Sequence, residues 1–167
     1  MTLRDQLKAG LIAGAAAGVL MDVFLFGSQL AAGTPADKLA GNFIFIAAAL
    51  LGPGHATSAA VTLAIVLDVC VSIGWAIGYV YLARTQPQLV VRPLISGAVF
   101  GFIVYAFMEV ILITGLSSHV TSGLLFRELI AETIFYGIPV ALIVSRLMRP
   151  VVAHPSTSSA AADSTSG

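Results

Sequence analysis

Charged residues are what this sequence has least of. Only 10% of its 167 residues are Asp, Glu, Lys or Arg, whereas 58% are hydrophobic. Soluble domains of ordinary composition carry about a quarter charged residues. The deficit excludes a soluble globular domain and indicates an integral membrane protein whose main partner is the lipid bilayer. The formal net charge is zero and no basic stripe is present, so we expect no nucleic-acid partner.

Cysteine is almost absent as well. The single Cys70 excludes an intramolecular disulfide and a CxxC redox site, and we interpret it as a small buried residue of a helix. The chain also lacks a nucleotide-binding loop, an HExxH motif and a GxSxG motif. No familiar catalytic arrangement is therefore available, and an enzyme is the least favoured class.

Long apolar runs are abundant and set the fold class. A membrane span needs about 20 mainly apolar residues. The first run exceeds the length of a signal-peptide core and Asp22 interrupts it, so we expect an uncleaved span. Thr2 and Asp5 have the spacing of a capping box, which places the helix start near Leu3. The sequence predicts an all-α membrane protein with one domain over 1–149 and spans at about 8–30, 57–83, 94–114 and 123–147.

A fifth segment, at about 35–51, has a helix start at Thr34-Pro35 and a stop at 52–54, but its apolar part is short. We expect an interfacial or re-entrant helix. The positive-inside rule favours four spans with both termini in the cytoplasm, because this arrangement puts six basic residues on one side. These are Arg4, Lys8, Arg84, Arg92, Arg146 and Arg149. The Ser/Ala/Thr-rich tail at 150–167 is predicted to be disordered and cytoplasmic.

The first and third spans resemble each other. The segment 11–18 matches 94–101 in its small-residue spacing, and 21–23 (Met-Asp-Val) is echoed by 108–110 (Met-Glu-Val). The pattern suggests duplicated helical hairpins in the same orientation. The alternative is chance, because Gly, Ala, Leu and Val dominate both segments.

Each predicted span carries one carboxylate deep inside its apolar run. At about 1.5 Å per helical residue, all four fall in one layer in the outer half of the membrane. A charged group at this depth is costly and usually marks a site. The alternative is that each acid is a hydrogen-bonded packing residue. The four are Asp22, Asp68, Glu109 and Glu132, with Glu128 and Arg127 just above them.

The acids outnumber the bases in this layer. Arg127 can pair with Glu128, Glu109 or Asp22, and the remaining carboxyls need protons or a bound cation, the one candidate cofactor. His55 and His119 fall in the outer loops and could complete a metal site, although ordinary loop residues are the alternative.

Small residues recur at every fourth position of the spans. This spacing lets helix backbones approach closely, and it lies on the same faces as Asp22 and Glu109. In the fourth span, Pro139 is expected to kink the helix and free the carbonyl of Phe135. The predicted packing positions are Gly10, Gly14, Gly18, Gly74, Gly78, Gly97 and Gly101.

Two of these features carry a family resemblance. The segments 10–14 (Gly-Leu-Ile-Ala-Gly) and 52–55 (Gly-Pro-Gly-His), with the small-residue repeat of the third span, resemble small bacterial inner-membrane proteins of the YagU-like kind. The resemblance implies a location in the bacterial cytoplasmic (inner) membrane and a four-helix topology. It assigns no functional residue.

Three hypotheses follow. The first is a proton- or cation-binding, transport-related protein that uses the carboxylates, with a homodimer completing the pathway. The second is a structural accessory subunit of a larger membrane complex. The third is a membrane enzyme with a metal held by His55, His119 and Glu128.

Overall fold

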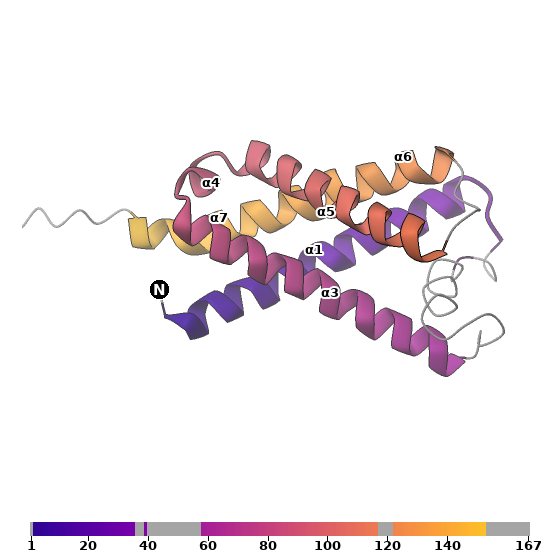
Figure 1. Cartoon of the computed structure of the whole chain (residues 1–167), viewed down its shortest axis with the longest axis horizontal. Helices are drawn as coiled ribbons and strands as arrows, with labels where there is room; N and C mark the ends of the chain where they lie inside the picture. Colours follow the sequence, from indigo (N-terminus) through magenta and orange to yellow (C-terminus); the bar gives the residue numbers. More distant parts are fainter. Residues whose placement is uncertain (1, 36–38, 40–57, 117–121, 153–167) are drawn as a thin grey trace, which may run out of the picture.

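The computed structural model describes residues 2–35, 39, 58–116 and 122–152, and every regular element in these ranges is helical (Figure 1). α1 spans Leu3–Ala31, α3 Ser58–Thr85 and α5 Pro93–Leu116, with the short α4 at Gln88–Val91. The last part of the chain is continuous and consists of α6 (Ser122–Ile130), η2 (Ala131–Gly137) and α7 (Ile138–Val152). We call this continuous rod the fourth span. The all-α class is confirmed.

Four helices are long and apolar enough to cross a membrane. They cover Leu3–Ala31, Val61–Thr85, Pro93–Val110 and Phe126–Met148, close to the predicted spans. The helix expected at 35–51 falls outside the described residues, apart from positions 35 and 39. The predicted tail also lies outside them from residue 153 onward, although α7 runs to Val152, beyond its predicted end.

Both ends of α1 follow from local sequence. The hydroxyl of Thr2 accepts a hydrogen bond from the Asp5 amide at 3.3 Å, and the Asp5 carboxylate accepts one from the Thr2 amide at 2.9 Å. At the other end, Gly33 adopts φ 77° while the amides of Gly33 and Thr34 bond back to Leu30 and Gln29. This is the Schellman arrangement, in which glycine tolerates the left-handed conformation that ends a helix.

Glycines set the close contacts inside the bundle. A Cβ on Gly14 would lie 2.6 Å from Ile73 Cα, so α1 and α3 touch through their backbones. A Cβ on Gly97 would lie 2.7 Å from Ile138 Cα, so α5 meets the fourth span in the same way. The first helix of each sequential pair thus uses its glycine face against the second.

The α3–α5 side of the bundle is built differently. Trp75 on α3 makes edge-on contacts with Phe100 and Phe107 of α5, with ring centroids 6.4 and 5.2 Å apart. Tyr79 adds a contact with Phe100 at 4.8 Å. Large side chains therefore bridge these two helices where glycines join the others.

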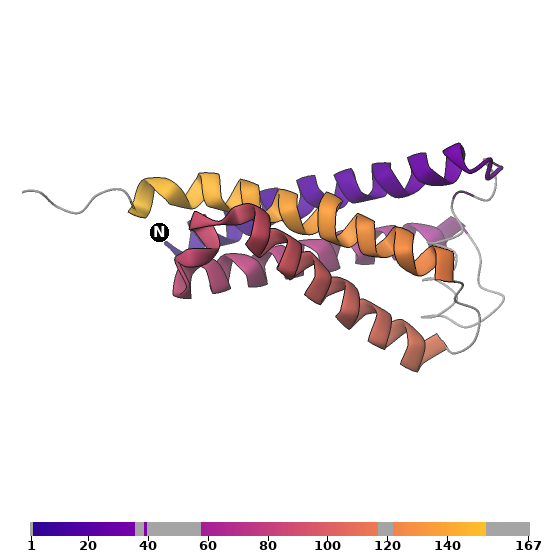
Figure 2. The same cartoon turned by 90° about the horizontal axis from the view of Figure 1, so that it is seen from above.

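The helices separate toward one end. We call the end with Leu3 and Val152 the terminal end, and the end with Ala31, Ser58, Leu116 and Ser122 the loop end. In Figure 1, α3 leaves the bundle toward the loop end, and Figure 2 shows α5 doing so in the perpendicular view. The backbone contacts at Gly10, Gly14, Gly97 and Gly101 lie on the terminal side of this separation.

The fourth span departs from the sequence prediction. In place of a proline kink, residues Ala131–Gly137 form a π-helix, in which the Ile138 amide donates to the Thr133 carbonyl five residues back. An α-helical turn would press the Pro139 ring against the carbonyl of Phe135. The wider π turn removes this conflict without a sharp bend. The helix α4, which buries Val90, was not predicted either.

Candidate functional site: an intramembrane carboxylate cluster

All four spans contribute carboxyl groups to the middle of the bundle. Each of these side chains is partly buried. We call the set the carboxylate cluster. Its members are Asp22 (α1), Asp68 (α3), Glu109 (α5), Glu128 (α6) and Glu132 (η2).

The members lie close enough for their charges to interact. Asp68 interacts with Asp22 and with Glu128. Glu132 interacts with Glu128, Asp68 and Asp22. Glu109 joins through Glu128. The structure therefore brings together the acids that counting along the helices placed at one depth.

Arg127 is the basic residue beside this cluster. Its Nη2 lies 3.4 Å from Glu128 Oε1, so the structure selects Glu128 among the three partners that the sequence left open. The contact is long for a charge-assisted hydrogen bond, and both side chains are partly exposed. The Nε of Arg127 is buried without a partner among the described residues. One loosely held guanidinium thus lies at Glu128, beside a cluster of five carboxyls.

Backbone packing fixes the position of Glu132. A Cβ on Gly101 would overlap the Glu132 carbonyl oxygen and approach Thr133 Cα to 2.7 Å. The glycine face of α5 is therefore pressed onto the π segment that carries Glu132. In the described part of the chain, Oε2 of Glu109 and Oγ1 of Thr133 are buried without hydrogen-bond partners. Two polar atoms at or next to the cluster are therefore free to form a hydrogen bond.

Tyr136 forms the inner boundary of the cluster. It is 1% exposed, its hydroxyl donates to the Ser72 carbonyl, and it interacts electrostatically with Glu132 and Asp68. Tyr136 follows Glu132 by four residues, as Glu132 follows Glu128, a spacing that favours one helical face. This hydrogen bond ties the π segment to α3 directly below the acids.

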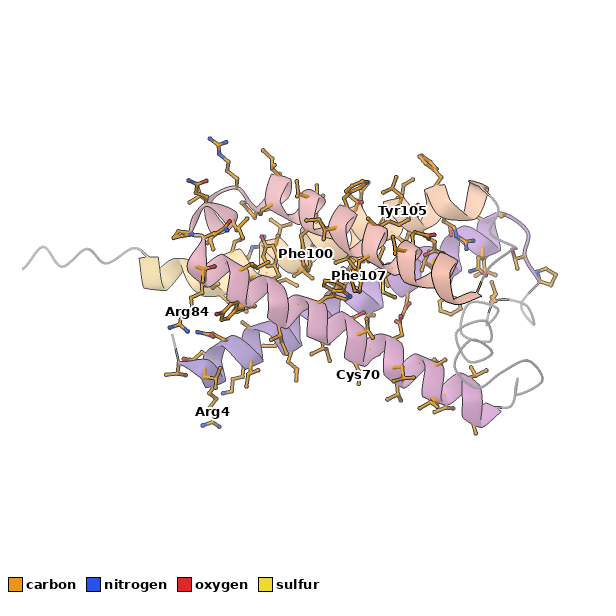
Figure 3. All side chains as sticks on the ribbon, viewed as in Figure 1. Arg4, Cys70, Arg84, Phe100, Tyr105 and Phe107 are labelled. Carbon is orange, nitrogen blue, oxygen red and sulfur yellow. The ribbon has the colours of Figure 1, made fainter. Side chains whose placement is uncertain are left out.

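Phe100 follows toward the terminal end. Its ring lies 6.4 Å from Tyr136 and 4.8 Å from Tyr79. Figure 3 labels Phe100 and Phe107 on α5, where both rings meet the side chain of Trp75. Sequence reasoning did not single out Phe100, because one phenylalanine in an apolar helix carries no signal of its role.

Several predicted residues are not part of the cluster. His55 and His119 lie outside the described residues. The described residues contain no group of three or more His, Cys, Asp or Glu arranged to hold a metal ion. Gly74 and Gly78, predicted to be packing positions, do not pack within the described part of the chain: both are exposed, and an added Cβ would meet no described atom within 4 Å. Cys70 is exposed and not buried. The physical reason is the same for all three, because α3 is apolar all round and its sequence does not distinguish lipid-facing from inward positions.

Comparison with known proteins adds no identification. No protein-family model, curated protein or solved structure matches the chain. The likeness to YagU-like proteins stays a prediction, and function is argued from the carboxylate cluster.

Proposed function

We propose that this chain is a small membrane protein that binds and relays protons at the carboxylate cluster. The observation that carries the proposal is the placement of five partly buried carboxyls, drawn from four helices, near one another and beside one arginine. Intramembrane acids that face one another are typical of proton relays.

Charge balance explains why protons are the proposed ligand. Five carboxylates minus one guanidinium leave four negative charges uncompensated if every group is ionised. Ionised groups in apolar surroundings are costly unless they are paired. Neighbouring carboxyls can share protons, which removes the repulsion between them. A proton also needs no coordination shell, whereas calcium takes about six to eight oxygen ligands.

The proposed setting is the bacterial inner membrane, with the terminal end in the cytoplasm, as the YagU-like resemblance implies. Figure 3 places Arg4 and Arg84 at that end, in agreement with the positive-inside rule. A homodimer is the proposed assembly, because four helices alone enclose little space for a pathway.

Proton flux tests the proposal directly. Purified protein is reconstituted into liposomes that enclose a pH-sensitive dye, and a pH gradient is imposed. We expect the wild type to dissipate the gradient and Glu132→Gln or Asp22→Asn to slow it about tenfold or more, because each removes a proton acceptor at the centre of the cluster. Asp163→Asn, in the tail, is the matched control and should keep the wild-type rate. Wild-type rates in both cluster variants would contradict the proposal.

A structural accessory subunit is the second candidate. It is favoured by the exposed pair Gly74 and Gly78, whose spacing suits close packing against another helix and which no described helix of this chain covers. Under this alternative, Gly74→Leu with Gly78→Leu releases a fixed membrane partner, while Glu132→Gln retains it. Retention of the partner by the leucine variant removes the alternative.

A further inference from the structure

We propose that Phe100 is the gate that closes the carboxylate cluster toward the terminal end. The proposal rests on the proton-relay function above. Phe100, with Tyr79 on one side and Tyr136 on the other, is here called the aromatic gate.

The gate is a layer of aromatic rings that joins three of the four spans. Phe100 is 6% exposed and belongs to α5, Tyr79 to α3 and Tyr136 to η2, so three of the four spans meet there. The ring contacts of 4.8 and 6.4 Å hold Phe100 between the two tyrosines, and Trp75 flanks it at 6.4 Å. Apolar constrictions of this kind block ions and protons by excluding water.

Polar groups lie on both sides of the Phe100 ring. On the cluster side, the Tyr136 hydroxyl is bonded to Ser72 and interacts with Glu132. On the terminal side, the Tyr79 hydroxyl lies 2.8 Å from Ser96 Oγ, which donates in turn to the Leu89 carbonyl at 2.8 Å. Hydroxyl groups can both donate and accept a proton. The Phe100 ring is thus the apolar break between two polar groups that could otherwise pass protons.

The closest backbone contact between α1 and α3 lies on the terminal side of Asp22. An added Cβ would lie 2.9 Å from Ile77 Cα at Gly10 and 2.6 Å from Ile73 Cα at Gly14, whereas at Gly18 the nearest α3 atom is the Ser72 Cβ at 3.3 Å. The two backbones are therefore closest near Gly14 and farther apart at Gly18. Figures 1 and 2 show α3 and α5 continuing to diverge toward the loop end. α1 stays packed on the fourth span beyond Asp22, where the rings of Phe24 and Phe135 stack at 4.1 Å, so the divergence concerns α3 and α5.

The α3–α5 interface is also the one suited to opening. Gly97 and Gly101 lock α5 to the fourth span through backbone contacts, and Gly10 and Gly14 lock α1 to α3. Between α3 and α5, the described residues meet through aromatic ring pairs and the hydroxyl pair of Tyr79 and Ser96. Side-chain contacts can rearrange by rotamer changes that backbone contacts do not allow.

Removing the ring tests the gate by flux. In the liposome assay, Phe100→Ala is expected to raise the proton leak about tenfold or more, because water can enter where the ring was. The matched control is Phe107→Ala, which removes a ring from the same helix that also contacts Trp75 but is 52% exposed. The double variant Phe100→Ala/Glu132→Gln should fall back to the Glu132→Gln rate. An unchanged leak in a folded Phe100→Ala protein, or an equal leak in Phe107→Ala, overturns the gate.

Thiol accessibility tests the gate without any flux. In a Cys70→Ser background, one cysteine is placed at Asp68 or at Ser96, and a membrane-impermeant thiol reagent is added from the loop side of sealed, oriented vesicles. We expect the cysteine at position 68 to react and the one at position 96 to react only when Phe100→Ala is also present. Reaction at position 96 with Phe100 in place, or none after its removal, overturns the proposal.

The two experiments separate the gate from the relay. If Glu132→Gln stops proton flux while the reactivity of the cysteine at position 96 is the same with and without Phe100→Ala, the relay stands and the gate is wrong. If the cysteine at position 96 reacts only with Phe100→Ala while Glu132→Gln leaves proton flux unchanged, the aromatic closure stands. The proton relay, and the gate's role in it, is then wrong.

Discussion

Three features of the carboxylate cluster involve Glu132. It interacts with three other carboxyls, belongs to the π segment, and its carbonyl lies against Gly101. Arg127 reaches Glu128 and leaves Glu132 without a basic partner among the described residues. Counting along the helices predicted the depth of Glu132. Its crowded surroundings could not be predicted, because they depend on how α5 packs against the π turn.

Tyr136→Phe tests the hydroxyl that borders the cluster. The variant keeps the ring and loses the hydrogen bond to the Ser72 carbonyl. We expect the free energy of unfolding to fall by about 0.5–1.5 kcal/mol, because an ordinary buried hydrogen bond contributes that much. Denaturant titration in detergent measures it. Tyr81→Phe, at a ring that is 63% exposed, is the control and should stay within error of the wild type. Equal stability of Tyr136→Phe would show that this bond contributes nothing.

At the scale of the element, apolar run length was enough to predict the four spans, but not their contact faces. The glycine faces of α1 and α5 lie where the i, i+4 spacing placed them. The same spacing failed for Gly74 and Gly78, because α3 touches its neighbours along a narrow strip and is apolar elsewhere. The π segment was missed for a different reason. Proline indicates a disturbed helix, but the form of the disturbance is settled by tertiary contacts such as Gly137 against Gly101.

Alanine at two glycines should therefore have opposite effects. Gly14→Ala places a Cβ 2.6 Å from the Ile73 backbone and should lower the free energy of unfolding by about 1–3 kcal/mol, because α1 and α3 must separate. Gly74→Ala meets nothing and should raise it by about 0.5–1 kcal/mol through helix propensity. Unfolding of both variants in the same detergent compares them. A stabilised Gly14→Ala protein would contradict the α1–α3 contact.

At the scale of the whole molecule, the bundle combines rigid and adjustable interfaces. Glycine contacts join α1 to α3 and α5 to the fourth span, whereas aromatic rings bridge α3 and α5. The carboxylate cluster includes Glu132, whose carbonyl lies against Gly101, and Asp22, which lies about one helical turn beyond Gly18. Composition and hydropathy predicted a membrane bundle with acids at one level. They gave no information on the separation of the helices, because lipid-facing and helix-facing apolar residues look alike in sequence.

Protonation of the cluster is the central claim, and infrared spectroscopy of the reconstituted protein measures it most directly. Protonated carboxyl groups have a C=O stretching band that ionised carboxylates lack. The account predicts that the wild type shows this band at neutral pH, that it disappears reversibly as the pH is raised, and that Glu132→Gln weakens it while Asp163→Asn does not. A wild-type protein with every carboxyl ionised at neutral pH would contradict the account.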